Sequence, residues 1–198
     1  MSSEEVGTLN LADPKAMRAM AHPVRMALME LLAVTPTLTA TQASEALGES
    51  PANCAFHLRT LAKYGFTEED PDSAADGRER PWRARMLAFS LNDVPGAPAA
   101  TRVASRLLVE NIRAAAEENR ARYVTRQSEY PADWQAAAGE TFSVAHVSPQ
   151  ELQQMREQVL EVMAPYIRVE PDSRPAGARP VRIMLDMFPW FGPGEDES

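Results

Sequence analysis

The chain has 198 residues, which suffices for one large domain or two small ones with a real hydrophobic core. Its 44% hydrophobic and 24% charged residues are typical of a soluble globular protein, and no apolar run reaches the roughly 18 residues that span a membrane. The single cysteine, Cys54, excludes an internal disulfide and a multi-cysteine metal site, and the net charge of −8 argues at first sight against a nucleic-acid partner.

Two helices are predicted within residues 11–33, after an acidic N-terminal tail at 1–13. The tail lacks a basic-then-apolar signal peptide, so we expect a cytoplasmic location. Asp13 is a good N-cap and Pro14 suits the first helical position. Because His22 precedes a proline, it is biased away from helical geometry, and we expect the two helices to meet there.

Two short helices joined by a glycine turn are predicted next, which is the pattern of a helix-turn-helix. The first covers about 39–47 and ends at Gly48, which fits a left-handed position after the helix. Ser50 caps the second helix, Pro51 fills its first position, and Gly65 closes it.

A β-hairpin is predicted after the second helix, with strands over 66–69 and about 82–91. The segment between them is rich in Asp, Ser, Ala and Gly, which indicates a long loop. A hairpin in this place is a wing, so residues 14–91 are predicted to form a winged helix-turn-helix domain. The range 78–85 in this hairpin carries four arginines and one glutamate.

The acidic excess lies outside this domain, because residues 14–91 hold nine basic and nine acidic side chains. Attraction to phosphate depends on the local field, which salt screens over about 8–10 Å. A basic tip on an acidic body is therefore compatible with DNA binding.

A linker at 92–100 and a long helix over 101–129 are predicted to follow. The helix has no proline or glycine and would be about 40 Å long at 1.5 Å per residue. Its apolar seam consists of Ala104, Leu108, Ile112 and Ala115. This seam packs either in the core of the same chain or against a second copy.

A small α+β unit is predicted near the C-terminus. Alternating residues indicate strands at 141–147 and 181–188, and the capping box that begins at Ser148 starts a helix between them. We expect residues 101–190 to form a dimerisation region with room for a nonmetal small-molecule effector, followed by an acidic tail at 191–198.

The second helix of the predicted helix-turn-helix has two distinct faces. Its inward face places Cys54 with Leu58 and Leu61, so the cysteine is interpreted as a small core residue. Its outward face consists of Ala52, Asn53, Phe56, Arg59, Thr60 and Lys63. Asparagine can pair with adenine, phenylalanine can touch a thymine methyl, and the basic residues suit phosphates.

His57 lies between these two faces. It either donates a hydrogen bond to a phosphate or packs in the core, and the sequence leaves both alternatives open. His22 is interpreted as a structural hydrogen-bonding residue. The three histidines have no metal-ligand spacing, and no nucleophile–base or paired-carboxylate motif indicates an enzyme.

The segments MAHPVRMALMELL, TATQASEALGESPANCAFHLRTLAKYGF and GRERPWRA together resemble the ArsR-type winged helix-turn-helix repressors. The chain looks most like the actinobacterial branch with an extended C-terminal region, and the match covers residues 14–91. The resemblance implies a homodimer on an inverted-repeat operator. Its recognition helices would enter successive major grooves, and its wings would touch the backbone or minor groove.

The chain departs from this family at two positions that commonly contact DNA. Pro51 stands where many members carry a polar residue, and Ala55 stands where they carry serine. Direct readout is therefore expected to be poor in hydrogen bonds, with apolar contact by Phe56 and DNA shape contributing more. The helix before the turn has no cysteine pair, so no metal site is expected.

The predicted fold is thus mainly α with a β-wing, plus a C-terminal long helix and a small α+β unit. The candidate DNA-binding residues are Ser50, Ala52, Asn53, Ala55, Phe56, His57, Arg59, Thr60, Lys63, Arg78, Arg80, Arg83 and Arg85. We expect a homodimeric repressor of transcription that binds double-stranded DNA, without cofactor. The alternative is a winged-helix module that binds another protein, which the net charge and the apolar outward residues favour.

Overall fold

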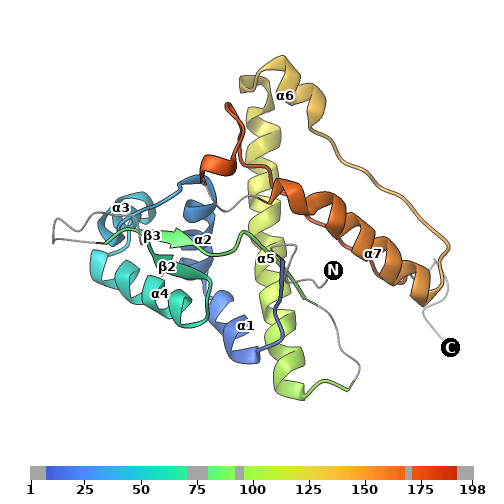
Figure 1. Ribbon diagram of the computed structural model, residues 1–198, viewed down its shortest axis with the longest axis horizontal. Coiled ribbons are helices and arrows are strands. Elements are labelled where there is room, and N and C mark those ends of the chain that lie inside the picture. The colour runs from blue at the N-terminus through green and yellow to red at the C-terminus, as the bar shows by residue number, and fades with distance from the viewer. Residues whose placement is uncertain (1–7, 71–79, 92–95, 168–170, 191–198) are drawn as a thin grey trace.

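The computed structural model describes residues 8–70, 80–91, 96–167 and 171–190 (Figure 1). Its elements are β1 (Thr8–Asn10), α1 (Pro14–Met20), α2 (Pro23–Val34), α3 (Ala40–Leu47), α4 (Pro51–Lys63), β2 (Thr67–Glu69), β3 (Trp82–Ala84), β4 (Ala88–Ser90), α5 (Ala99–Arg126), α6 (Ala132–Ala137) and α7 (Pro149–Met163). The hairpin loop with Arg78, part of the linker and the acidic tail lie outside the described residues. Among the helices of the described ranges, none has the length and apolar character to cross a membrane.

The helix boundaries predicted from capping residues are confirmed. The side chains of Asp13, Thr39 and Ser50 each accept a hydrogen bond from a backbone N–H in the first turn of the helix that follows. Gly48 ends α3 with a φ of 70°, the left-handed geometry that costs glycine little. The break at His22 is also found, since α1 ends at Met20 and α2 begins one residue after the histidine.

The hydrophobic core lies between α1, α2, α4, α5 and the wing. Its fully buried large side chains are Leu28, Leu32, Leu58, Leu61, Phe66 and Leu108. Burying each such side chain contributes about 1.5–3 kcal/mol to folding. The helix-turn-helix is therefore held from behind by a conventional core, and this core fixes the orientation of α4.

Helix α5 begins two residues before its predicted start and runs along α1 (Figure 1). Ala104 and Leu108 are buried in the core of the same chain, and Ile112 packs against it. The amide of Asn111 also donates to the backbone carbonyl of Ala21 at 2.8 Å, which ties the helix to the end of α1. Of the two predicted alternatives, these three residues of the apolar seam thus pack in the core of the same chain.

The wing is an antiparallel pair of β2 and β3, in which Thr67 lies opposite Ala84. The predicted second strand over 82–91 is wrong in its length. It divides into β3 and β4, and β4 pairs in parallel with β1 rather than with β2. Met86 and Leu87, two successive apolar residues that both pack on the core, break the alternation and turn the chain between the strands. The predicted N-terminal tail accordingly contains a strand, β1.

The predicted strands at 141–147 and 181–188 are absent from the structure, which is extended but unpaired there. Helix α7 between them is confirmed, with its capping box between Ser148 and Glu151. A strand needs a neighbouring backbone with which to exchange hydrogen bonds, and within the described chain neither segment has one. Alternation alone predicted the extended backbone and could not supply that neighbour.

Candidate nucleic-acid interface

Helix α4 lies at the edge of the fold, beside α3 and the wing and on the opposite side of α5 from α7 (Figure 1). Ser50 accepts a hydrogen bond from the backbone N–H of Asn53 at 3.2 Å, and Pro51 occupies the first helical position. Proline has no N–H to leave unsatisfied at that position. The N-terminal end of α4 is exposed, as base-edge contact requires.

The inward face of α4 is the predicted one. Cys54, Leu58 and Leu61 are fully buried. Burial raises the pKa of the Cys54 thiol, with Glu49 adding to the effect, so the thiol stays neutral and unreactive. Its interpretation as a small core residue is therefore supported by its surroundings.

The outward face of α4 carries the predicted residues. Phe56 is 56% exposed, and Ala52, Arg59 and Lys63 are exposed as well. Ala55 and Thr60 are half-buried, and the Thr60 hydroxyl donates to the carbonyl oxygen of Phe56 at 2.9 Å. Neither Arg59 nor Lys63 forms an ion pair with any described residue. These two cations are free to meet phosphates.

Asn53, the predicted base-reading residue, is engaged within the chain. Its amide donates to the carboxylate of Glu49 at 2.7 Å, from four residues earlier. To read an adenine edge, the amide must leave this acceptor or share it. Glu49 therefore belongs to the interface, although sequence reasoning did not name it; the spacing of four residues across the helix start was the available signal.

His57 lies inside the fold rather than on its surface. Its side chain is buried, its ring lies 4.5 Å from that of His22, and its Nδ1 accepts a hydrogen bond from Arg25 at 3.2 Å. A guanidinium can only donate, so this bond requires a neutral ring with Nδ1 unprotonated. Burial, with the nearby His22 and Arg25, lowers the pKa of His57. Of the two alternatives, these contacts favour packing over a phosphate contact.

The wing is anchored to the body of the domain by Trp82. Its side chain is buried in the core, and its backbone exchanges two hydrogen bonds with Leu38, of 2.8 and 3.0 Å. Leu38 precedes α3, so the wing and the helix-turn-helix share a fixed junction.

The arginines of the wing face carboxylates from the opposite strand. Arg83 and Arg85 both contact Glu68, at 2.7 and 3.3 Å, and Arg80 contacts Glu69 at 3.1 Å. Glu68 and Glu69 are themselves partly exposed, at 36% and 47% of their side chains. Pairing β2 with β3 places them beside the arginines, which a count along 78–85 alone does not reveal.

The electrostatic consequence is a wing whose described charges balance. Exposed ion pairs of this kind are weak, about 0–1 kcal/mol, because water and salt screen them. Arg80 and Arg85 remain largely exposed, whereas the Arg83 side chain is only 23% exposed. A phosphate can thus replace a carboxylate at the exposed pairs at little cost, and the balance of charge restrains binding where no phosphate is present.

No group of three or more His, Cys, Asp or Glu side chains suited to a metal ion occurs in the part of the chain that the structure describes. The described residues present an exposed helix face, two cations without ion pairs and a wing with exchangeable ion pairs, an arrangement suited to recognition at a surface.

The fold defined by these elements is a winged helix-turn-helix with a C-terminal long helix. A family model described as a helix-turn-helix domain matches residues 20–70, about a quarter of the chain. No curated protein matches the chain in sequence. A helix-turn-helix domain indicates a regulator that binds double-stranded DNA, and proteins of this kind are typically not enzymes.

Proposed function

We propose that the chain is a sequence-specific transcriptional repressor of the ArsR type, which binds an inverted-repeat operator as a homodimer. Residues 14–91 form the DNA-binding domain, and residues 101–190 form the dimerisation region. The observation that carries this proposal is the exposed outward face of α4, which is capped at its start and fixed from behind by a buried core.

Contacts to the phosphate backbone come from α4 and the wing. Arg59 and Lys63 extend from α4 without an ion pair to any described residue, and Arg80 and Arg85 are exposed on the wing. Each phosphate neutralised by such a cation releases counterions, so binding weakens as salt rises. The acidic remainder of the chain keeps this attraction local.

Base recognition relies on few polar groups. Phe56 offers an apolar surface to a thymine methyl, and Asn53 reads adenine after exchanging its bond to Glu49. Ser50 and Ala52 are small enough for the helix end to approach the base edges closely. We infer that DNA shape contributes a large share of the specificity.

Fluorescence anisotropy with DNA from upstream of the protein's own gene tests this function. We expect binding with a steep salt dependence, and Arg59→Ala should reduce the slope of log K against log salt by about 1 on specific and random DNA alike. Arg156→Ala, on α7 away from α4, is the matched control and should leave the slope unchanged. Salt-independent binding, or none to any upstream fragment, would contradict the proposal.

The second candidate function is a winged-helix module that binds another protein. The observation that favours it is the charge balance of the wing, where Glu68 and Glu69 face the arginines. The two functions differ at low salt: a DNA-binding wing gains affinity for random duplex DNA there, whereas a protein-binding wing remains indifferent to it.

A further inference from the structure

The residues after α5 form a projecting arm without a core of its own. We define the C-terminal arm as residues 132–167 and 171–190, which include α6 and α7. No residue with a described side chain in this arm is buried. Helix α7 is a 15-residue amphipathic helix, yet the best-covered side chains of its apolar face, such as Met155 and Val159, are only half-buried. A helix of this kind normally gains its stability from a covered face.

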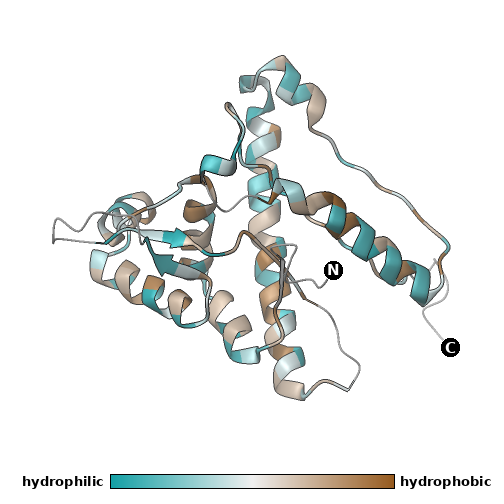
Figure 2. Ribbon diagram, viewed as in Figure 1, coloured by the Kyte–Doolittle hydropathy of each residue, from teal (hydrophilic) through white to brown (hydrophobic). Residues whose placement is uncertain are grey.

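The arm also exposes most of the large hydrophobic side chains found on the described surface. They are Phe142, Val144, Val147, Val162, Tyr166, Val181, Ile183, Met184, Leu185, Phe188 and Trp190. Figure 2 shows hydrophobic residues on α7 and along the segment that leads into it. A patch of this extent on a folded protein marks an interaction surface.

Two segments of the arm have extended backbones without backbone partners. Residues 139–147 and 179–190 make no backbone hydrogen bond with any described residue. Both carry apolar residues at alternate positions, Phe142 and Val144 in the first and Val181, Ile183 and Leu185 in the second, with further apolar residues between them. The two segments belong to the same arm and yet do not pair with each other.

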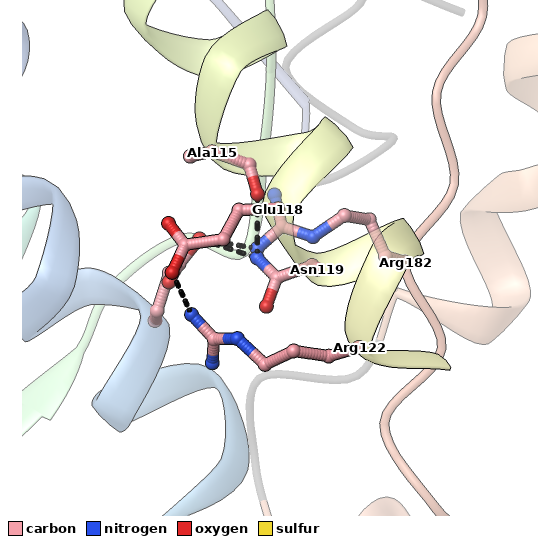
Figure 3. Close-up of polar contacts among 6 residues, drawn as sticks. Ala115, Glu118, Asn119, Arg122 and Arg182 are labelled. Atoms are coloured by element: carbon pink, nitrogen blue, oxygen red, sulfur yellow. Dashed lines mark hydrogen bonds and ion pairs between the residues drawn. The ribbon is translucent and has the colours of Figure 1, made fainter. Parts of the chain in front are cut away.

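The second segment is held in position on one side by polar contacts. Arg182 donates to Glu30 of α2 at 2.6 Å, and Arg113 of α5 pairs with Asp186 at 2.9 Å. Figure 3 shows Arg182 reaching the same place beside α5 as Asn119, which also donates to Glu30 at 3.1 Å. These contacts hold Arg182 and Asp186 against α2 and α5 of the same chain.

Apolar side chains of this segment are left uncovered between and beside these two contacts. Val181 is 66% exposed, Ile183 55% and Leu185 43%. Met184 and Phe188 are 45% and 64% exposed as well. The segment is therefore anchored to its own chain at two side chains, and it leaves exposed apolar side chains and backbone groups that form no backbone hydrogen bond with a described residue.

We propose that the C-terminal arms of two copies pair with each other. Residues 141–147 of one copy add as a strand to residues 181–187 of the other, and the apolar face of α7 covers the sheet formed in this way. The inference deepens the proposed function and rests on it for the homodimer. Twofold symmetry makes the exchange reciprocal, so both segments of both copies gain a partner.

A second copy is the occupant that these observations favour over an unrelated protein. Each arm carries both halves of the pairing, so two identical arms satisfy one another completely. Eleven side chains with roughly 100 Å² exposed apiece provide on the order of 1,000 Å² per copy, against about 800 Å² per partner in a standard interface. Helix α7 lies across α5 from α4, so its pairing leaves both recognition helices open (Figure 1).

Sedimentation equilibrium of the full chain tests the pairing. We expect the wild type to be a dimer and the double variant Val181→Asp/Ile183→Asp to have half its mass, with helix content retained by circular dichroism. Val34→Asp, which places the same charge at an exposed valine of α2, is the matched control and should remain a dimer. A monomeric wild type, or a double variant that stays dimeric, would overturn the proposal.

Disulfide trapping tests the pairing without charged substitutions. Val144→Cys and Ile183→Cys are made in separate chains, one of them carrying an affinity tag, and are mixed and oxidised. We expect a tagged–untagged disulfide, while the buried Cys54 remains unreacted. If the chain with both substitutions instead closes a disulfide within itself and forms no link between chains, the two segments pair inside one copy and the proposal fails.

DNA binding measured on the same samples separates this inference from the proposed function. If the wild type is a monomer that binds upstream DNA, the arm pairing is ruled out and the DNA-binding role stands. If the cross-linked dimer binds no DNA, the arm pairing stands and the DNA-binding role is ruled out.

Discussion

The winged helix-turn-helix and the C-terminal arm are built from similar sequence patterns but reach different states of completion. Each contains an amphipathic helix, α4 or α7, that begins with an N-capping serine followed by proline. Helix α4 buries four residues of its inward face, whereas α7 buries none. The comparison teaches that a local sequence pattern determines whether a helix forms. Whether its apolar face is buried depends on the elements that pack against it.

The largest expected difference between the two regions concerns stability. Leu58→Ala removes a fully buried side chain from a closed core and should lower the free energy of unfolding by about 2–5 kcal/mol. This loss should not depend on protein concentration. Ile183→Ala in the arm should instead destabilise the protein mainly through weaker association, so its effect should change with concentration. Urea unfolding at two protein concentrations measures both.

If Ile183→Ala lowers the free energy of unfolding equally at every protein concentration, the arm is covered within one chain. It would then not differ from the helix-turn-helix in needing a second copy. Val34→Ala, at an exposed position of α2, gives the baseline, since such a surface change is worth within about 0.5 kcal/mol.

A smaller effect is expected from releasing the wing arginines. Glu68→Gln removes the carboxylate that both Arg83 and Arg85 contact, so neither cation has to give up Glu68 when it meets a phosphate. We expect DNA affinity to rise several-fold, by about 1 kcal/mol, at low salt. Anisotropy titrations measure the change. Glu161→Gln, which removes an exposed carboxylate from α7 in the arm, should leave affinity nearly unchanged. An equal gain in DNA affinity from this variant would mean that the effect of Glu68→Gln comes from the change in net charge and not from the wing arginines.

The smallest effect concerns pH and the histidine pair behind α4. Burial lowers the pKa of His57 and His22 below their usual 6.5, Arg25 acts in the same direction, and Glu49 opposes it. The unfolded chain therefore takes up protons first. Stability is fully present above about pH 6.5 and falls as pH drops from there through the lowered pKa values.

His57→Gln keeps a hydrogen-bond acceptor for Arg25 without a titrating ring, so it should flatten this decline. Urea midpoints measured between neutral and mildly acidic pH check the slope. His146→Gln, at an exposed histidine of the arm, should leave the slope as it is. A wild-type protein whose stability is level across this range would contradict the assignment.

Much of the helix-turn-helix could be predicted because its signals are local. Thr39, Gly48, Ser50 and Pro51 act within one turn of the chain, and their caps and boundaries are found where the sequence places them. The wing arginines lie close together in the sequence too, but the carboxylates that they contact come from the other strand. Glu68 meets Arg83 only after two strands pair across 15 residues, and a stretch-by-stretch reading counts these charges separately.

The errors share the same physical origin. Strand β4 pairs with β1, which lies near the start of the chain, and the extended segments of the arm have no backbone hydrogen-bonding partner in the described chain. A strand is defined by a partner that lies distant in sequence, whereas a helix contains its own hydrogen bonds. His57 illustrates the same limit: helical periodicity placed it at a boundary, and only His22 and Arg25 from another element decide which side it occupies.

The start of α4 has a thermodynamic consequence for any duplex that it meets. With Ser50 bonded to the N–H of Asn53 and Pro51 in place, the first turn needs no induced ordering when a ligand arrives. Association therefore avoids the conformational entropy that a disordered reading segment loses on binding. Calorimetry should record a modest negative heat-capacity change, matching the area of a preformed helix face rather than that of a segment that folds as it binds.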